Sequence, residues 1–209
     1  WFSLCIRRMV KNAHDEGGNF LDNGARNYRR FLEGDDDGLV EIVREYKDGL
    51  MLFLNTYVRN MTVAEDLAED TFVRLVTKKP SFRGASSFRT WLYAIGRYVA
   101  IDHLRRASKE TLMPMETAEK MSADDFLEQL ELDYLKEERK IAIHRALLQL
   151  KQDYREVLWL LYFEELSYKD AARVMKKTHR SVEALAYRAR KALKEILEDM
   201  EGEWNHEDL

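Results

Sequence analysis

Residues 166–194 read LSYKDAARVMKKTHRSVEALAYRARKALK, and this stretch decides the fold class of the C-terminal half of the chain. Ser167 and Asp170 form a capping-box pattern, which predicts a short helix that ends near Met175. Two lysines then form a turn, and Thr178 can cap a longer basic helix. A short helix, a tight turn and a longer helix are typical of a helix-turn-helix.

The longer helix of this motif has an apolar face and a polar face. Helical spacing turns one set of residues inward to form a buried seam: Val174, Val182, Leu185, Ala186, Ala189 and Leu193. In such motifs the first turns of the second helix enter the major groove of DNA. The candidate DNA contacts are Lys176, Lys177, His179, Arg180, Glu183, Ala184, Tyr187, Arg188 and Lys191. A helical hairpin that binds protein is the alternative interpretation.

Two of these candidate DNA contacts have side chains that suit particular bases. Arg188 can reach the O6 and N7 atoms of guanine or a phosphate, and Glu183 can accept from N4 of cytosine. Lys176, Lys177 and His179 lie where the N-terminus of a helix meets phosphates. The motif therefore predicts contacts to both bases and backbone.

Outside this motif, the chain is also helical by pattern. Apolar residues at steps of three and four predict helices over 26–33, 39–58, 62–77, 88–107, 126–150 and 153–163. The predicted N-caps are Asp35 or Asp36, Thr62 in a capping box with Glu65, and Ser87. Residues 78–86 contain Pro80 and Gly84 and are predicted to be a loop. No strand pattern is present, so we predict an all-α fold.

The predicted organisation is two small helical domains joined by a linker. The segments are an extension that is disordered or artefactual (1–25), a first domain (26–107), an acidic linker (108–134), a second domain with the helix-turn-helix (135–200) and an acidic tail (201–209). The extension is set apart because the chain begins with Trp1 and its first methionine is Met9.

The composition excludes several classes of protein. No apolar run reaches the roughly 18 residues of a membrane span. The single cysteine, Cys5, excludes an internal disulfide framework and a cysteine-rich zinc site. The histidines show no ligand spacing, and no phosphate-binding or dinucleotide-binding glycine motif is present. We therefore expect a cytoplasmic protein with no metal and no cofactor.

The charges are unevenly distributed, although the net charge is only −4. Residues 74–106 hold eight Lys or Arg and one acid, and residues 169–194 hold nine Lys or Arg and two acids. Residues 107–140 hold ten acids and five bases. Two basic segments separated by an acidic one indicate two contacts on a polyanion. Ordinary solvated helix faces are the alternative interpretation.

Residues 82–98 combine aromatic side chains with arginines. Aromatic faces stack on unpaired bases and cations hold the backbone, so this combination suits single-stranded nucleic acid. The candidates are Phe82, Arg83, Arg89, Trp91, Arg97 and Tyr98. For the aromatic members, the alternative interpretation is that they pack in the hydrophobic core and do not bind nucleic acid.

Three acids share one face of the helix predicted at 62–77. Asp66, Glu69 and Asp70 follow one another at spacings of three and four. An acidic face repels DNA and suits a basic protein partner.

Together these motifs resemble an extracytoplasmic-function (ECF) sigma factor of the bacterial sigma-70 family. Residues 64–76, AEDLAEDTFVRLV, resemble the helix that docks on the clamp coiled coil of RNA polymerase. Residues 81–106, SFRGASSFRTWLYAIGRYVAIDHLRR, resemble the part that melts and captures the −10 element. Residues 166–194 resemble the helix-turn-helix that reads the −35 element. The resemblance covers roughly residues 36–107 and 140–198.

The resemblance implies a role for each set of residues. Core polymerase would be bound by the core-binding set, which consists of Asp66, Glu69, Asp70 and Phe72. The six candidates within residues 82–98, here called the −10 set, would hold single-stranded promoter DNA. The nine candidates of the helix-turn-helix, Lys176 to Lys191, here called the −35 set, would read duplex promoter DNA. An anti-sigma factor is a further expected partner. The family makes no bonds itself, so we expect no enzyme activity and no small-molecule substrate.

The sequence departs from the family pattern in three places. Glu69 stands where glutamine is common, Lys176 and Lys177 stand where the turn usually has small or neutral residues, and the recognition helix has Glu183-Ala184-Leu185 in place of Lys/Arg-Ser-Arg. A promoter sequence borrowed from the family is therefore not safe to use here.

Two other functions stay open from the residues alone. A helix-turn-helix regulator would bind duplex DNA without polymerase, and it would not need the acidic face at 66–72. A nuclease would use Asp66, Glu69 and Asp70 to hold a metal ion and would show metal-dependent cleavage.

Overall fold

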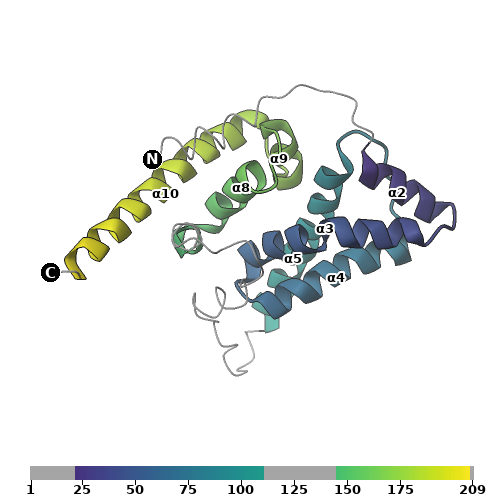
Figure 1. Ribbon diagram of the computed structural model, residues 1–209, viewed down its shortest axis with the longest axis horizontal. Coiled ribbons are helices and arrows are strands. Elements are labelled where there is room, and N and C mark those ends of the chain that lie inside the picture. The colour runs from purple at the N-terminus through teal and green to yellow at the C-terminus, as the bar shows by residue number, and fades with distance from the viewer. Residues whose placement is uncertain (1–21, 111–144, 208–209) are drawn as a thin grey trace.

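The computed structural model describes residues 22–110 and 145–207 (Figure 1). It confirms the predicted all-α fold, with no strand in either described range. The helices, in chain order, are α2 (Asn23–Leu32), α3 (Asp37–Val58), α4 (Met61–Lys78), α5 (Phe88–Glu110), α8 (Gln152–Tyr162), α9 (Tyr168–Met175) and α10 (His179–Glu207). None of these helices is both long and apolar enough to cross a membrane.

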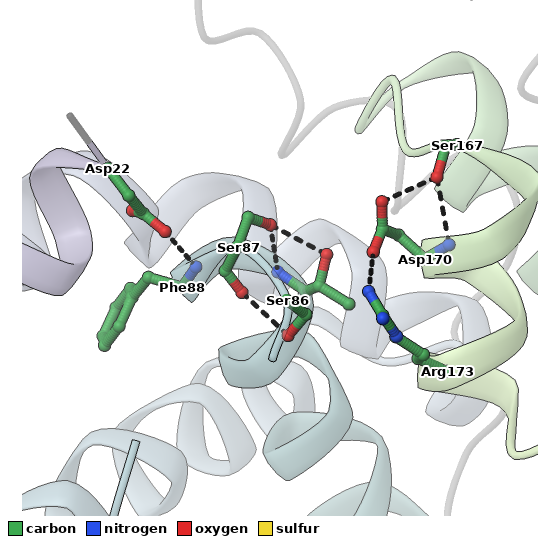
Figure 2. Close-up of polar contacts among 8 residues, drawn as sticks. Asp22, Ser86, Ser87, Phe88, Ser167, Asp170 and Arg173 are labelled. Carbon is green, nitrogen blue, oxygen red and sulfur yellow. Dashed lines mark hydrogen bonds and ion pairs between the residues drawn. The ribbon is translucent and has the colours of Figure 1, made fainter. Parts of the chain in front are cut away.

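The first helix begins inside the segment that was predicted as an extension. The Asp22 carboxylate accepts a hydrogen bond from the Ala25 amide at 3.2 Å, and this cap starts α2 at Asn23. The same carboxylate also accepts from the amide of Phe88, which begins α5 (Figure 2). One side chain therefore caps two helices that lie far apart in the sequence.

Two helices run past their predicted ends. α5 continues to Glu110, into the predicted linker, and α10 continues to Glu207, into the predicted acidic tail. The remainder of the linker and the helix predicted from residue 126 lie outside the described residues up to residue 144. Residues 145–149 are helical, in agreement with the end of that prediction.

The predicted caps of α5 and α9 are confirmed. The Ser87 hydroxyl accepts from the Thr90 amide at 3.2 Å. The Ser167 hydroxyl accepts from the Asp170 amide at 3.1 Å and donates to the Asp170 carboxylate at 2.6 Å (Figure 2). At the start of α10, the Thr178 hydroxyl accepts from the amide of the third residue after it at 3.2 Å, so this cap is also confirmed.

The capping box predicted for α4 is wrong. Asn60 is the N-cap, and its side chain accepts from the Val63 amide at 3.0 Å, while Thr62 lies inside the first turn. Asn60 takes this role because it is the first extended residue after the left-handed Arg59 that ends α3. Glu65, the expected reciprocal partner, instead forms an ion pair with a lysine of α3. At α3, Asp36 is the N-cap position, but its side chain makes no capping bond.

The described helices form one continuous core. Buried residues of α2 to α5 and of α8 to α10 belong to a single hydrophobic cluster. Figure 1 shows α8 and α9 between α10 and the helices α3 and α5, and α8 packs on α3 while α9 packs on α5. The two domains predicted from the sequence are therefore closed on each other in this structure.

Candidate nucleic-acid interface

The helix-turn-helix has the two faces that helical spacing predicts. Val174 of α9 and Val182, Ala186 and Ala189 of α10 are fully buried, so the seam between the helices is formed. Lys176 turns the chain between them in a left-handed conformation with φ of 53°. Every residue of the −35 set lies on the exposed side of the motif. The geometry therefore offers one continuous polar surface to a groove.

Some residues of the −35 set already have partners within the chain. Lys177 lies 3.3 Å from the Asp153 carboxylate, and His179 lies 3.5 Å from that of Glu183. Among the described residues, Arg180 and Arg188 form no ion pair. These two guanidinium groups are therefore available to DNA without breaking an existing bond.

The loop between α4 and α5 borders a hollow on the surface of the first domain. This hollow has a volume of about 440 Å³. Its lining residues come from α2 and from the loop, and they are Asp22, Ala25, Tyr28, Arg29, Leu32, Phe82, Arg83, Gly84 and Ser86. It therefore combines the half-buried Phe82 ring with two guanidinium groups, while the Tyr28 ring is buried at 1% exposure. A ring beside cations suits single-stranded nucleic acid.

An aromatic cluster supports the floor of this hollow. The Phe82 ring lies 5.2 Å from Trp91 and 5.7 Å from Phe88, and Tyr28 lies 5.2 Å from Trp91. The Tyr28 hydroxyl donates to the carbonyl of Pro80 at 2.8 Å, which ties the loop to α2. Phe82 and Trp91 are half-buried, so they have a core role and an accessible edge.

The hollow contains two residues that sequence reasoning missed. Tyr28 and Arg29 belong to α2, outside the segment from which the −10 set was drawn. A signal was present, because residues 25–31 read ARNYRRF and mix aromatic side chains with arginines as residues 82–98 do.

The remaining residues of the −10 set do not line the hollow. Tyr98 on α5 is 51% exposed, and the Arg74 guanidinium and the Lys176 amine lie 5.3 Å and 5.9 Å from its ring. Arg89 and Arg97 point to the second domain instead of to solvent. The structure therefore splits the −10 set between the hollow and the contact between the domains.

The acidic face on α4 lies at the surface, as expected for Asp66, Glu69 and Asp70. The face continues into two exposed apolar side chains, Val73 at 52% and Val76 at 40%. Phe72 is only 7% exposed and packs in the core, so its side chain is not presented to a partner. No group of three or more His, Cys, Asp or Glu that could hold a metal ion occurs within residues 22–110 and 145–207.

A buried ion pair joins α5 to α8. Arg97 Nε donates to Glu156 Oε1 at 2.6 Å, and the two side chains are 15% and 1% exposed. Burial raises the pKa of Glu156 above its ordinary value, although the Arg97 charge opposes this effect. Arg97 is therefore committed to a carboxylate of the second domain.

Arg155, the neighbour of Glu156, joins the two domains through backbone carbonyls. Its Nε donates to Thr56 at 2.9 Å, and its Nη1 donates to Leu148 at 3.2 Å and to Leu150 at 2.7 Å. Burial, followed by repulsion from Arg59, lowers the pKa of Arg155 to about 10. The guanidinium thus satisfies carbonyl groups near the C-terminal ends of two helices, where the helix dipoles are negative.

Glu164 provides a third contact between the domains. Trp159 Nε1 donates to its Oε1 at 3.2 Å, and Arg89 donates to its backbone carbonyl at 3.3 Å. Burial raises the pKa of Glu164, while a hydrogen bond from Tyr93 of α5 opposes this rise. Sequence reasoning selected neither acid, but Glu156 falls on the apolar face of its helix with Leu160 and Phe163, which is a signal of burial.

Comparison with known protein families gives matches to both halves of the chain. The family model described as Sigma-70 region 2 matches residues 42–110, and the one described as Sigma-70, region 4 matches residues 140–193. The first match contains the acidic face and the −10 set, and the second contains the helix-turn-helix.

Curated relatives are similar to this chain over most of their own length, which agrees with the two family matches. The RNA polymerase sigma factor YlaC of Bacillus subtilis is 32% identical over 158 residues, which cover 76% of this chain and 91% of that protein. The RNA polymerase sigma-H factor of Pseudomonas aeruginosa is 30% identical over 177 residues, covering 82% and 92%. The ECF RNA polymerase sigma factor SigW of Bacillus subtilis is 27% identical over 178 residues, covering 82% and 95%.

Solved structures share the fold. The sigma factor RpoE in complex with the anti-sigma factor NepR, from Bartonella quintana, matches with a TM-score of 0.59 at 24% identity, covering 78% of this chain and 98% of that chain. CnrH in complex with the cytosolic domain of CnrY matches with a TM-score of 0.58 at 23% identity, covering 85% and 96%. With both regions matched in order and relatives aligned over nearly their whole length, the chain belongs to the sigma-70 family of RNA polymerase sigma factors, in its extracytoplasmic-function class.

Proposed function

We propose that this chain binds core RNA polymerase and directs it to promoters, where α10 reads the −35 element and the first domain holds the melted −10 element. The observation that carries this proposal is the helix-turn-helix, in which the inner seam is buried and the whole −35 set is exposed. The polymerase makes the bonds, and this chain supplies recognition. Because polymerase and chromosome share the bacterial cytoplasm, the protein acts there.

At the −35 element, α10 lies in the major groove with its first turns toward the bases. The guanidinium groups of Arg180 and Arg188 form no ion pair in the described structure, so they can bind guanine or phosphate without losing a partner. Glu183 must leave His179 to accept from cytosine. Lys176 and Lys177 contact backbone phosphates beside the turn.

At the −10 element, the hollow beside the 79–87 loop receives an unpaired base. Its volume of about 440 Å³ falls within the range of about 300–1,000 Å³ typical of ligand sites. Phe82 supplies a half-buried ring, with Tyr28 packed behind it at 1% exposure, and Arg29 and Arg83 supply charge. Each base stacked on an aromatic side chain contributes about 1–3 kcal/mol, which helps to trap a strand that has left the duplex.

Core polymerase binds the acidic face of α4. Asp66, Glu69 and Asp70 supply charge, and Val73 and Val76 supply apolar area on the same helix. An exposed apolar pair beside acids is suited to a basic partner with apolar residues. Phe72 supports this face from below, through the core.

An anti-sigma factor is a further partner. The two solved structures of similar fold include a sigma factor bound to the anti-sigma factor NepR, and CnrH bound to a domain of CnrY. We include such a partner in the proposal because this chain has the same fold over both domains.

The first experiment measures binding to purified core RNA polymerase. The double variant Asp66→Lys/Asp70→Lys reverses two charges of the acidic face, and we expect it to lose binding at least ten-fold. Glu41→Lys/Glu45→Lys is the matched control, because it reverses two acidic charges at the same spacing on α3.

Equal binding by the wild type and the Asp66→Lys/Asp70→Lys variant would contradict the assigned docking face. A folded wild-type chain that binds duplex DNA but no polymerase would instead be a helix-turn-helix regulator, and the main proposal would fail.

A further inference from the structure

We propose that Arg190 is a positioning residue for −35 recognition, because its bonds to the hydroxyls of Tyr162 and Tyr168 fix the direction of α10. These three residues lie outside all three binding sets. The inference rests on the proposed function, since it assigns Arg190 a part in reading the −35 element. Arg190 acts through α10 and reads no base itself.

The first observation is the bonding of the Arg190 guanidinium. Its Nη1 donates to the Tyr162 hydroxyl oxygen at 2.9 Å and to the Tyr168 hydroxyl oxygen at 3.0 Å. Tyr162 is the last residue of α8, and Tyr168 is the first residue of α9. One side chain of α10 is therefore bonded to both helices on which α10 packs (Figure 1). Such bonds from a charged donor are about twice as strong as bonds between neutral groups.

Tyr168 also contacts α10 at a second point, near the start of that helix. Its ring meets the His179 ring edge-on, with centroids 6.1 Å apart and an angle of 68° between the ring planes. His179 and Arg190 are about three helical turns apart, which is about 16 Å along the axis. A helix that is attached at two separated points keeps its direction, whereas a helix attached at one point can pivot.

The apolar seam between α9 and α10 needs this additional support. Its fully buried residues have short side chains, and they are Val174, Val182, Ala186 and Ala189. Apolar burial has no preferred direction, so the seam holds the two helices together without selecting one tilt. A binding surface works only when its groups lie within about 0.5 Å and about 10–20° of the productive geometry. Because Glu183 and Arg188 belong to α10, any tilt of this helix displaces both of them.

The competing role for Arg190 is a direct contact to a DNA phosphate. Arg188 is exposed, but Arg190 is half-buried and bonded to the two tyrosines. Although burial opposes the change, these bonds raise the pKa of Arg190 above its ordinary value. The two roles respond differently to the loss of the tyrosine hydroxyls. Removing them leaves the charge for a phosphate in place and removes only what positions α10.

The experiment measures the specificity of the full chain in complex with core polymerase. The wild-type complex selects duplexes from a random pool, and the most enriched duplex is the specific probe. The same duplex with its protected upstream segment scrambled is the nonspecific probe. We expect Tyr162→Phe/Tyr168→Phe to lower the ratio of the two affinities about ten-fold. Its affinity for the nonspecific probe stays unchanged, because no charge has been removed.

Two further variants complete this comparison. Arg190→Lys keeps the charge but loses the planar fork that spans two acceptors, so we expect it to lower the ratio as well. Tyr154→Phe is the matched control, because Tyr154 is a half-buried tyrosine of α8 whose hydroxyl forms no hydrogen bond among the described residues. It keeps the wild-type ratio.

A second readout follows the direction of α10 without DNA or polymerase. Spin labels are attached at Lys169→Cys on α9 and Lys194→Cys on α10, two exposed positions, in a Cys5→Ser background of the full chain. We expect a narrow distribution of distances between the labels in the otherwise wild-type chain. The distribution becomes broader or displaced in Tyr162→Phe/Tyr168→Phe and stays the same in Tyr154→Phe.

An unchanged specificity ratio in the folded Tyr162→Phe/Tyr168→Phe variant would overturn the inference, and so would an unchanged distance distribution. Circular dichroism and urea denaturation check that each variant is folded. A merely structural role would lower the free energy of unfolding and leave the ratio of the folded chains as it is. If the double variant does not fold, Tyr168→Phe and Arg190→Lys decide the result.

Failure of the proposed function is a separate outcome. A wild-type chain that binds no polymerase refutes that function. The spin-label distances still show whether Arg190 fixes the direction of α10, because that measurement contains no polymerase.

Discussion

Arg188 and Arg97 are both arginines, but their side chains have opposite surroundings in this chain, one exposed and one bonded to a carboxylate. Arg188 lies exposed on α10, and among the described residues it forms no ion pair. Arg97 is 15% exposed and bonded to Glu156 at 2.6 Å. Both have the same guanidinium group, so the surrounding packing decides whether that group is free for DNA.

Arg188→Ala tests the free arginine. If Arg188 reads a base, the variant weakens −35 recognition by about 1–3 kcal/mol and relaxes the preference at one position. The measurement is selection of promoter fragments by the complex with polymerase, followed by salt-dependent binding. Lys177→Ala is the control, because a phosphate contact lowers affinity for all sequences and shallows the salt slope. An unchanged promoter preference would remove the base-reading role of Arg188.

Arg59→Gly tests a strained residue at the end of α3. Arg59 has a φ of 53°, and its charge lowers the pKa of Arg155 by repulsion. Glycine adopts this conformation freely, so we expect the variant to gain about 1 kcal/mol in the free energy of unfolding. Arg44→Gly, at an exposed position within the same helix, loses about 1 kcal/mol. Urea denaturation measures both, and a loss at Arg59 comparable to that at Arg44 would refute the argument.

At the scale of elements, helices and most caps follow from local sequence. The caps at Ser87, Ser167 and Thr178 were predictable because Ser and Thr are preferred N-cap residues and each stands directly before a segment with helical apolar periodicity. The cap of α4 was not, since it depends on the left-handed residue that ends α3. Asp22 could not be predicted as the cap of α5, because that bond depends on α2 and α5 meeting in space.

Asp22→Ala tests this double cap. Each lost cap costs about 1 kcal/mol, so we expect about 2 kcal/mol from the two helices together. Asp36→Ala is the matched control, because Asp36 occupies the N-cap position of α3 and makes no capping bond. Its expected effect is within about 0.5 kcal/mol. Thermal and urea unfolding of both variants provide the measurement, and equal losses would show that the Asp22 bonds contribute nothing.

At the scale of the whole molecule, the sequence predicted two domains but not their closure. Periodicity reports which face of each helix is buried, and it does not report which other helix covers that face. Arg97 and Glu156 lie 59 positions apart in the chain, and nothing in their local patterns pairs them. The −35 set was predictable because its exposure depends on α9 and α10 alone, whereas the −10 set depends on α2, α8 and α9 as well.

The balance between the closed and open forms depends on pH. Burial raises the pKa of Glu156 and of Glu164 above the ordinary value of 4.5. The closed form therefore binds protons more tightly than an open form in which both acids meet water. The groups that face these acids are Arg97, Tyr57 and Asp153 for Glu156, and Tyr93, Trp159 and Arg89 for Glu164.

Acidification thus favours closure, in the range from the raised pKa values down to 4.5, and a rise in pH favours opening. Energy transfer between dyes attached at Lys78→Cys and Lys194→Cys in a Cys5→Ser background, measured from neutral pH to pH 5, should increase in the otherwise wild-type chain. The double variant Glu156→Gln/Glu164→Gln should show a flatter profile. A decrease of transfer on acidification would have the wrong sign and would refute this linkage.

The pairing of Arg97 with Glu156 of the same chain also affects which nucleic acids the free protein binds before it reaches a promoter. Aromatic and cationic surfaces bind any unpaired strand with little regard to sequence. A bacterial cell is full of such strands, because messenger RNA far outnumbers the open promoters of one regulon. If the −10 set binds single strands as proposed, a free chain whose Arg97 is paired with Glu156 is expected to bind these decoys less tightly. Such a chain is expected to reach polymerase with fewer RNA strands bound to its −10 set.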